Sequence, residues 1–269
     1  MVRGLQTHFN APVDSAVLRE LAERGAFVRG ERVRLMARMD CQTLDEVELV
    51  EQTATVRAAG LVPLVIVTDA EQIALLARGD YAEPRNEPDI EGPDPATYRV
   101  LLAECAVAAR AAGVTLCAPG VTNFTRRGFD YLRAIGPLPD GVVCSMHRYP
   151  PVAATWSTPH KGYRSREDEV RELRDIIGWA RPFGISEFGY HTAPERVGWW
   201  KFTREKRRSD EQAAWDIAHE FAFWESQGAA FCVAYQLNDG PRDEPLDRYG
   251  MRTVDGQWKP QAETFRVND

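Results

Sequence analysis

The sequence lacks long apolar runs and any segment that resembles a signal peptide. Its longest apolar runs, such as residues 61–67, are far shorter than the roughly 20 residues of a membrane-spanning helix. The N-terminal segment has no extended apolar stretch. We therefore expect no membrane partner, and a protein of the cytoplasm or a secreted protein whose signal peptide is not part of this sequence.

Positive charge is also scarce, because 33 Lys and Arg face 40 Asp and Glu, which gives a net charge of −7. Binding of nucleic acid needs a basic surface that contacts phosphates, so no nucleic-acid partner is expected. The one basic run, residues 204–208, is interrupted by Glu205 and is typical of a solvated loop. Five cysteines without a C-x-x-C spacing argue against a disulfide framework, a structural zinc site and a catalytic thiol.

What remains is ordinary globular composition, with 44% hydrophobic and 27% charged residues. No low-complexity linker or change in composition divides the 269 residues. The length is close to the roughly 250 residues of one α/β barrel. We therefore predict a single domain over residues 1–269.

Short apolar runs alternate with helical patterns along the whole chain. The predicted strands are Gly4–Phe9, Arg32–Ala37, Leu61–Val67, Asp80–Asn86, Val114–Ala118, Gly141–His147, Phe183–Phe188 and Ala229–Leu237. The predicted helices are Pro12–Arg24, Leu44–Ala59, Ala70–Arg78, Ala96–Ala112, Gly128–Ile135, Arg166–Ala180 and Asp210–Gln227, with Gly60 and Gly113 ending the second and fourth. Eight alternating units without a glycine-rich dinucleotide fingerprint predict a single (β/α)8 TIM barrel, an α/β fold, rather than an open sheet.

The ends of these strands carry charged and polar side chains, which are costly to desolvate unless paired or used. Glu87 follows the fourth strand and Glu187 lies in the seventh, so the barrel places them across one opening. Two facing carboxylates suit cleavage of a glycosidic bond, in which one donates a proton and the other attacks the anomeric carbon. Glu83 and Asp69 also lie near strand ends, and we interpret both as structural.

Four motifs in this order resemble those of glycoside hydrolase clan A, the retaining (β/α)8 glycosidases, and families five and thirty-nine in particular. They are Asn86-Glu87-Pro88 at strand four, His147-Arg148-Tyr149 at strand six, Ser186-Glu187-Phe188-Gly189 at strand seven, and Arg34 in strand two. The stretch from Arg248 to Pro260 is also similar to the clan's segment after strand eight. The resemblance covers nearly the whole chain.

The resemblance implies a role for each matching residue. Glu87 would be the acid and then the base, and Glu187 the nucleophile. Asn86 would hold the sugar 2-hydroxyl, Tyr149 would orient Glu187 and His147 would line the subsite of cleavage. Arg34 would keep Glu187 ionised, and His8, at the end of strand one, is a further substrate-binding candidate. No cofactor and no metal are implied, and the partner is a carbohydrate substrate.

One position departs from the clan, which frequently ends strand eight with a tryptophan under the reacting sugar. Here Tyr235-Gln236-Leu237 stands at this place, with Gln236 nearest the expected site. Aromatic platforms for sugar are instead expected in loops, from Trp156 after strand six and from Trp199 and Trp200 after strand seven. Three other tryptophans, Trp179, Trp215 and Trp224, have helical spacing and are predicted to pack between helix and sheet.

The preferred hypothesis is a retaining glycoside hydrolase that cleaves a β-glycosidic bond in an oligo- or polysaccharide. A metal-dependent TIM-barrel sugar isomerase or phosphoesterase is one alternative, in which Glu87, His147 and Glu187 would bind a divalent ion. A non-catalytic carbohydrate-binding barrel is another: the intact pair of glutamates argues against it, and the missing tryptophan keeps it open. The patterns specify neither the sugar and linkage nor endo or exo action, and give no oligomeric state.

Overall fold

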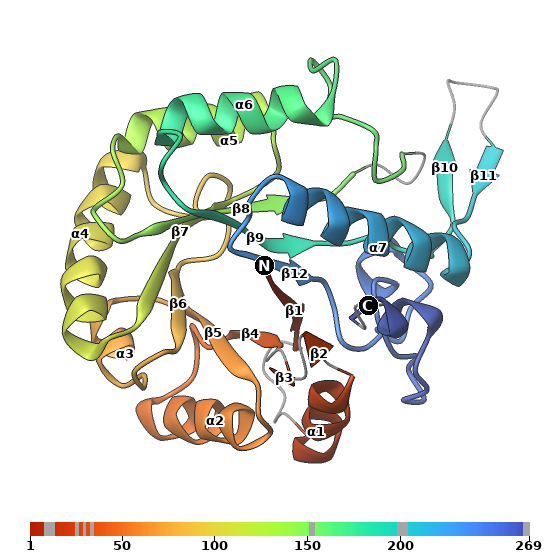
Figure 1. The fold of residues 1–269 in the computed structure, drawn as a ribbon, viewed down its shortest axis with the longest axis horizontal. Coiled ribbons are helices and arrows are strands. Elements are labelled where there is room, and N and C mark those ends of the chain that lie inside the picture. Colours follow the sequence, from red (N-terminus) through yellow and green to blue (C-terminus); the bar gives the residue numbers. More distant parts are fainter. Residues whose placement is uncertain are drawn as a thin grey trace.

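The computed structural model, which describes residues 1–7, 14–24, 27–28, 31–32, 35–150, 154–197 and 204–265, contains a closed barrel of eight parallel strands (Figure 1). The strand order around the barrel is β1-β12-β9-β8-β7-β6-β5-β4. These strands are β1 (Val2–Gln6), β4 (Met36–Asp40), β5 (Val62–Val67), β6 (Tyr81–Pro84), β7 (Thr115–Val121), β8 (Val143–Arg148), β9 (Phe183–Phe188) and β12 (Phe231–Ala234). The predicted (β/α)8 fold is confirmed.

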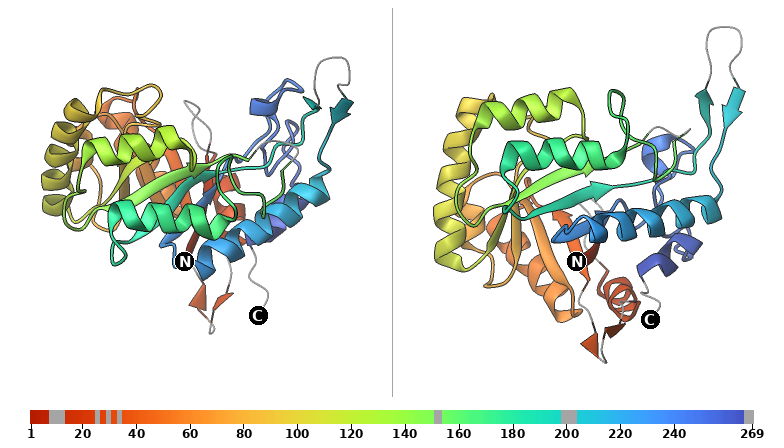
Figure 2. Two further views of the ribbon diagram at one scale, coloured as in Figure 1. Left: turned by 90° about the horizontal axis from the view of Figure 1, so that it is seen from above. Right: turned by 45° about the horizontal axis from the view of Figure 1, so that its top comes forward.

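Most predicted strands lie within a few residues of the observed ones, and β9 matches its prediction at both ends. The second predicted strand, Arg32–Ala37, is wrong in its position, because β4 begins at Met36 and runs to Asp40. Arg32 instead ends a two-stranded antiparallel sheet of β2 (Phe27–Val28) and β3 (Glu31–Arg32), which the sequence did not predict. A second unpredicted sheet pairs β10 (Glu195–Val197) with β11 (Arg204–Lys206) and projects from the barrel in Figure 2.

Helices lie outside the barrel, as expected for parallel strands joined by crossover connections (Figure 1). They are α1 (Ser15–Glu23), α2 (Glu46–Ala58), α3 (Ala70–Ala74), α4 (Pro95–Ala112), α5 (Arg126–Ile135), α6 (Arg166–Ile177) and α7 (Asp210–Ser226), with the 3-10 helices η1 (Pro245–Asp247) and η2 (Pro260–Phe265) after the last strand. A side chain caps each α-helix at its start; Asp45, for example, forms a reciprocal capping box with Glu48. Gly113 ends α4 in the left-handed conformation, as predicted.

The half of the barrel interior that lies away from the carboxyl ends of the strands is apolar. A cluster of fully or almost fully buried side chains fills it: Met36, Leu64, Cys117, Val143, Phe231 and Val233. Gly184 lies against the Phe231 ring, where an added Cβ would come within 2.5 Å of it. Apolar side chains therefore fill this part of the interior. A site inside the barrel can form only at the carboxyl ends of the strands.

A buried ionic cluster fixes the loop between β8 and α6. Glu220 of α7 accepts hydrogen bonds from Arg166 at 2.7 and 3.0 Å and from the Tyr190 hydroxyl at 2.6 Å. Arg148 lies 3.5 Å from Glu220 and donates to the carbonyl of Thr158 in this loop at 2.7 Å. The cluster therefore connects β8, α6 and α7, and holds a loop on the active-site face of the barrel.

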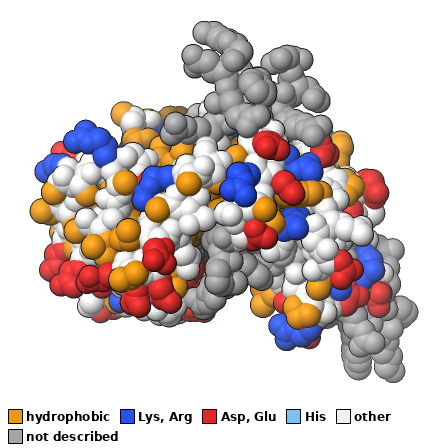
Figure 3. All heavy atoms as spheres, turned by 90° about the horizontal axis from the view of Figure 1, so that it is seen from below, with side chains coloured by type: hydrophobic (Ala, Val, Ile, Leu, Met, Phe, Trp, Pro, Cys, Tyr) orange, Lys and Arg blue, Asp and Glu red, His pale blue; other side chains and the backbone are white. Residues whose placement is uncertain are grey.

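The surface in Figure 3 carries acidic and basic side chains interspersed with hydrophobic ones. Among the described residues, no helix is long and apolar enough to cross a membrane. All five cysteines are free and buried, and burial raises the pKa of Cys41, Cys105 and Cys144 to about 12. A thiol with such a pKa is protonated at neutral pH.

Candidate active site

The site is built at the carboxyl ends of β6, β8 and β9. Glu187 lies within β9, His147 within β8 with Tyr149 just after it, and Glu87 follows β6. The backbone around Asn86 is unusual, because Arg85 and Glu87 have positive φ angles of 64° and 43°. Such angles are costly for residues with a side chain and cluster at functional sites.

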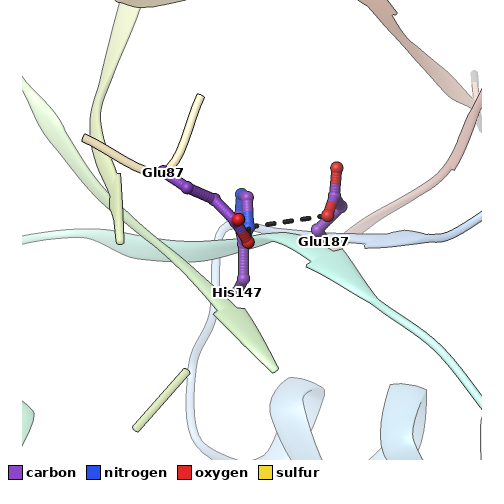
Figure 4. Close-up of side chains that lie close together, drawn as sticks. All are labelled: Glu87, His147 and Glu187. Atoms are coloured by element: carbon purple, nitrogen blue, oxygen red, sulfur yellow. Dashed lines mark hydrogen bonds and ion pairs between the residues drawn. The ribbon is translucent and has the colours of Figure 1, made fainter. Parts of the chain in front are cut away.

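Glu87 and Glu187 lie on either side of the His147 ring (Figure 4). His147 Nδ1 is 2.9 Å from an oxygen of Glu87 and 3.5 Å from an oxygen of Glu187. One ligand atom from each of the three residues lies within 4.8 Å of the others. The two carboxylates thus face a common space, as their positions in the sequence predict.

Glu187 is the more firmly held of the two carboxylates. One oxygen accepts a hydrogen bond from Arg38, and the other accepts one from the Tyr149 hydroxyl at 2.5 Å. Its side chain is 6% exposed, whereas that of Glu87 is 20% exposed. Glu187 is therefore oriented and charge-compensated in place, while Glu87 retains access to solvent.

Arg38 of β4 supplies the positive charge that the sequence analysis assigned to Arg34. Its fully buried guanidinium also donates to Glu83 at 2.7 and 3.0 Å and to the side-chain oxygen of Asn86 at 3.0 Å. Burial alone would lower the pKa of Arg38, but the charges of Glu83 and Glu187 raise it above its ordinary value. Arg34 lies outside the described residues.

Arg38 was not predicted as a site residue, because the apolar run interpreted as strand two ended at Ala37. The signal was the alternation in Met36-Ala-Arg-Met-Asp40, which puts a charged residue near the carboxyl end of the observed strand. Asn86, by contrast, was predicted, and the bond from Arg38 fixes its amide. The NH2 group of Asn86 remains to donate to a ligand.

Glu83 sits beneath the site and is structural, in line with its interpretation from sequence. Besides Arg38, it accepts hydrogen bonds from the hydroxyls of Ser145 at 2.7 Å and Ser186 at 2.8 Å. Burial raises the pKa of its carboxyl, but Arg38 and His147 outweigh burial and lower it below the ordinary value. Gly120 is needed here, because a Cβ at this position would lie 2.3 Å from a Glu83 oxygen.

His147 Nδ1 and a Glu87 oxygen lie within hydrogen-bond distance, and each residue shifts the pKa of the other. Burial lowers the pKa of His147, but the charge of Glu187 and the hydrogen bond to Glu87 raise it above its ordinary value. Burial raises the pKa of Glu87, but the hydrogen bond and charge of His147 lower it below its ordinary value. In the ligand-free site the proton is therefore held on His147 Nδ1, and Glu87 is ionised.

Three tyrosines stand on the Glu187 side of the site. The rings of Tyr149, Tyr235 and Tyr249 contact one another edge to face, with centroids 5.4 to 5.9 Å apart. Burial raises the pKa of Tyr235, and the charge of Glu187 raises it further. Tyr235, which directly follows β12, thus contacts the ring of Tyr149, the residue that donates to Glu187.

Gln236 was predicted to lie nearest the site, and the hydrogen bond of its side chain is made to the segment that follows β12. Its amide NH2 donates to the carbonyl of Leu246 at 3.2 Å, in the segment that follows β12. The prediction followed the regular alternation of a strand as far as Leu237, but β12 ends at Ala234.

The structure does not bring Trp156 to the carboxylates either, because its ring packs against Trp215 and His219 of α7. Trp215 and Trp179 are 48% and 67% exposed, so the prediction that they pack inside was wrong. Trp224 is fully buried, as predicted. The candidates His8, Trp199 and Trp200 lie outside the described residues.

Comparison with solved structures identifies the class of barrel. An exo-β-1,4-mannosidase from the Opitutaceae bacterium strain TAV5 superposes with a TM-score of 0.66 at 13% identity, covering 98% of this chain and 58% of that one. A family 39 glycoside hydrolase from Bacteroides cellulosilyticus WH2 gives 0.64 at 15% identity, covering 98% and 62%. This chain therefore spans about three fifths of each of these two proteins.

A third structure is similar over nearly all of both chains. The family 128 endo-β-1,3-glucanase from Sorangium cellulosum has a TM-score of 0.65 at 15% identity, covering 98% of this chain and 97% of that one. No family model and no curated protein matches the sequence. These similarities show that the chain shares its barrel fold with glycoside hydrolases of families 5, 39 and 128, of which the sequence resembles the first two.

Proposed function

We propose that the protein is a retaining glycoside hydrolase that cleaves a β-glycosidic bond in an oligo- or polysaccharide by double displacement. The observation that carries this proposal is the pair of glutamates, whose nearest ligand oxygens lie within 4.8 Å of each other. Retaining enzymes place the two carboxyl groups about 5 Å apart, whereas inverting enzymes leave room for a water between them. The fold shared with glycoside hydrolases supports the same function.

The contacts support different roles for the two glutamates. Glu187 takes the nucleophile's role in this proposal, because the hydrogen bonds from Arg38 and from the Tyr149 hydroxyl hold and orient its carboxylate. It attacks the anomeric carbon while Glu87, the more exposed carboxyl, donates a proton to the leaving oxygen. In the second step Glu87 takes a proton from water, and the water displaces the sugar from Glu187.

The acid step needs a proton on Glu87, which His147 can deliver across the 2.9 Å between Nδ1 and the carboxylate. Substrate that fills the opening displaces water, and the loss of solvation raises the pKa of Glu87. The proton then moves from Nδ1 to the carboxylate before it reaches the leaving oxygen. For the second step the ionised Glu87 of the ligand-free geometry is already the form that acts as a base.

Replacement of His147 with Gln is expected to move the basic limb of the kcat/KM profile to lower pH. In the native site the proton of the His147–Glu87 pair is retained up to the raised pKa of His147. In the variant the proton resides on the carboxyl alone. The profile should be measured with an aryl β-glycoside, with His219→Gln as the matched control; an unmoved basic limb would contradict this role.

Two side chains would contact the sugar above Glu187. The NH2 group of Asn86 can donate to the 2-hydroxyl, because Arg38 already occupies its oxygen. Tyr235 would take the place of the strand-eight tryptophan and stack its ring on the sugar. A tyrosine offers a smaller face than a tryptophan but adds a hydroxyl that can bond to the substrate.

The proposal is tested by a screen against aryl β-glycosides and a panel of polysaccharides, with the anomer of the first product followed by NMR. A β-anomer that forms first and then mutarotates is expected. Initial release of the α-anomer would contradict a retaining mechanism. Tight binding of an oligosaccharide without any cleavage would favour the non-catalytic barrel instead.

A second candidate function, metal-dependent catalysis, is favoured by the three ligand atoms of Glu87, His147 and Glu187. Against it, the fixed positive charge of Arg38 contacts Glu187 and lies 3.2 Å from His147 Nε2, where it would repel a divalent ion. Glycosidase activity is therefore expected to persist after dialysis against a chelator. Loss of activity with chelator, restored by one added divalent metal, would favour the isomerase or phosphoesterase class.

A further inference from the structure

An aromatic cluster lies on the outside of the barrel, formed by Trp156, Trp215 and His219. The Trp156 and His219 rings are stacked with centroids 5.1 Å apart and planes 25° apart, and the His219 and Trp215 centroids are 3.9 Å apart. Trp215 is 48% exposed and the other two are partly exposed. We call these three residues the outer aromatic cluster.

Backbone and side-chain contacts hold the rings in place. The Trp156 N–H donates to Asp216 at 3.1 Å, and its carbonyl accepts from Arg166 at 2.7 Å. His219 Nδ1 lies 2.8 Å from the carbonyl of Trp215 and must donate to it, which leaves Nε2 as an acceptor. The cluster is therefore preorganised, and a ligand would lose little entropy in ordering it.

The surroundings indicate what kind of ligand fits. Of the exposed residues of α7 near Trp215, Glu211 and Gln212 are polar and Ala218 is small, and the other large hydrophobic side chains that are exposed in the described chain lie on other elements. A stable protein interface buries about 1,000 Å² or more around an apolar centre, which one tryptophan within polar surface does not offer. Aromatic faces beside hydrogen-bonding groups instead match a pyranose, which has C–H faces and hydroxyl edges.

We propose that the outer aromatic cluster is a second carbohydrate-binding site, which holds a neutral polysaccharide chain away from Glu87 and Glu187. The proposal rests on the proposed function for its ligand class, but its geometry is separate. The loop that carries Trp156 begins after β8, and α7 runs along the outside of the barrel (Figure 1). A chain bound there is retained near the opening while the catalytic pair works on it.

The test compares Trp215→Ala with Trp179→Ala by affinity electrophoresis in gels that contain a soluble β-1,4-glucan, a β-1,4-mannan or a β-1,3-glucan. Trp179 is a matched control because it is 67% exposed and, in the described chain, pairs with no other ring. Both changes are made in a Glu187→Gln background, which prevents hydrolysis during the run. We expect at least one polymer to retard the parent, Trp215→Ala to bind it about fivefold more weakly, and Trp179→Ala to bind it as the parent does.

Further measurements distinguish the outcomes. With Glu187 intact, Trp215→Ala should hydrolyse an aryl β-glycoside normally but lose rate on dilute polymer, and Trp215→Phe should recover much of the binding. Equal retardation of Trp215→Ala and its parent, or no retardation of the parent by any polymer, would overturn the site. A change in oligomeric state on Trp215→Ala would overturn it in favour of a protein interface. Retardation that depends on Trp215 in a protein without hydrolytic activity would refute the proposed function but support this site.

Discussion

We expect Glu187→Gln to lower kcat on an aryl β-glycoside by about 10⁴-fold or more, because loss of a reacting side chain removes the covalent step itself. Glutamine keeps the shape of glutamate: its oxygen can still accept from Arg38 while its NH2 group donates to the Tyr149 hydroxyl, so the fold should persist. It lacks the negatively charged carboxylate oxygen that attacks the anomeric carbon. The measurement is steady-state hydrolysis with an activated leaving group, together with a thermal unfolding curve for each variant.

Rescue by azide tests the role of Glu187 as the nucleophile more directly. In Glu187→Ala the space beside the anomeric carbon is open, so azide should restore turnover and give a glycosyl azide of inverted configuration. Glu91→Gln, which changes an exposed glutamate after β6, is the matched control and should keep full activity. Undiminished turnover by Glu187→Gln, or rescue of Glu187→Ala with retained configuration, would remove Glu187 from the nucleophile's role.

The sequence predicted the barrel because hydrophobic burial imposes a pattern on each strand. The run 62–67 of β5 is apolar on both faces, as a strand between the interior and α2 must be. Glu87 and Glu187 were predicted as site residues from their charge and not from an apolar pattern. Charged groups at strand ends are costly unless they are used, and each lies next to residues that form a motif.

Arg38 was missed because the predicted strand ended at Ala37, and its role depends on contacts that its own strand does not reveal. Burial of an arginine depends on partners from other strands, here Glu83 of β6 and Glu187 of β9. One strand's sequence does not contain that information. The prediction for Trp215 was wrong for a similar reason, because its spacing along α7 is the same whether its side of the helix meets the sheet or solvent.

Removal of the Arg38 charge should have the largest effect on stability. We expect Arg38→Met to lower the free energy of unfolding by about 3–5 kcal/mol at pH 7, because the buried carboxylates of Glu83 and Glu187 lose their shared cation. Methionine fills similar space without a charge. Urea unfolding followed by circular dichroism measures the difference, and Arg38→Met combined with Glu83→Gln should cost less than Arg38→Met alone.

The loss of stability in Arg38→Met should also depend on pH, which provides a second, independent test. In the native protein the pKa of Glu83 is lowered from its ordinary value: burial raises it, but Arg38 outweighs burial. A carboxyl whose pKa is lower in the folded state stabilises the fold above its unfolded pKa, and this contribution is lost as pH falls through the folded value. Arg38→Met removes the charge that opposes burial most strongly, so the pKa of Glu83 rises and acidification should stabilise the variant relative to the native protein. The difference in unfolding free energy should therefore be smaller at pH 4 than at pH 7; a difference that is constant with pH would mean that Arg38 contributes packing and not charge.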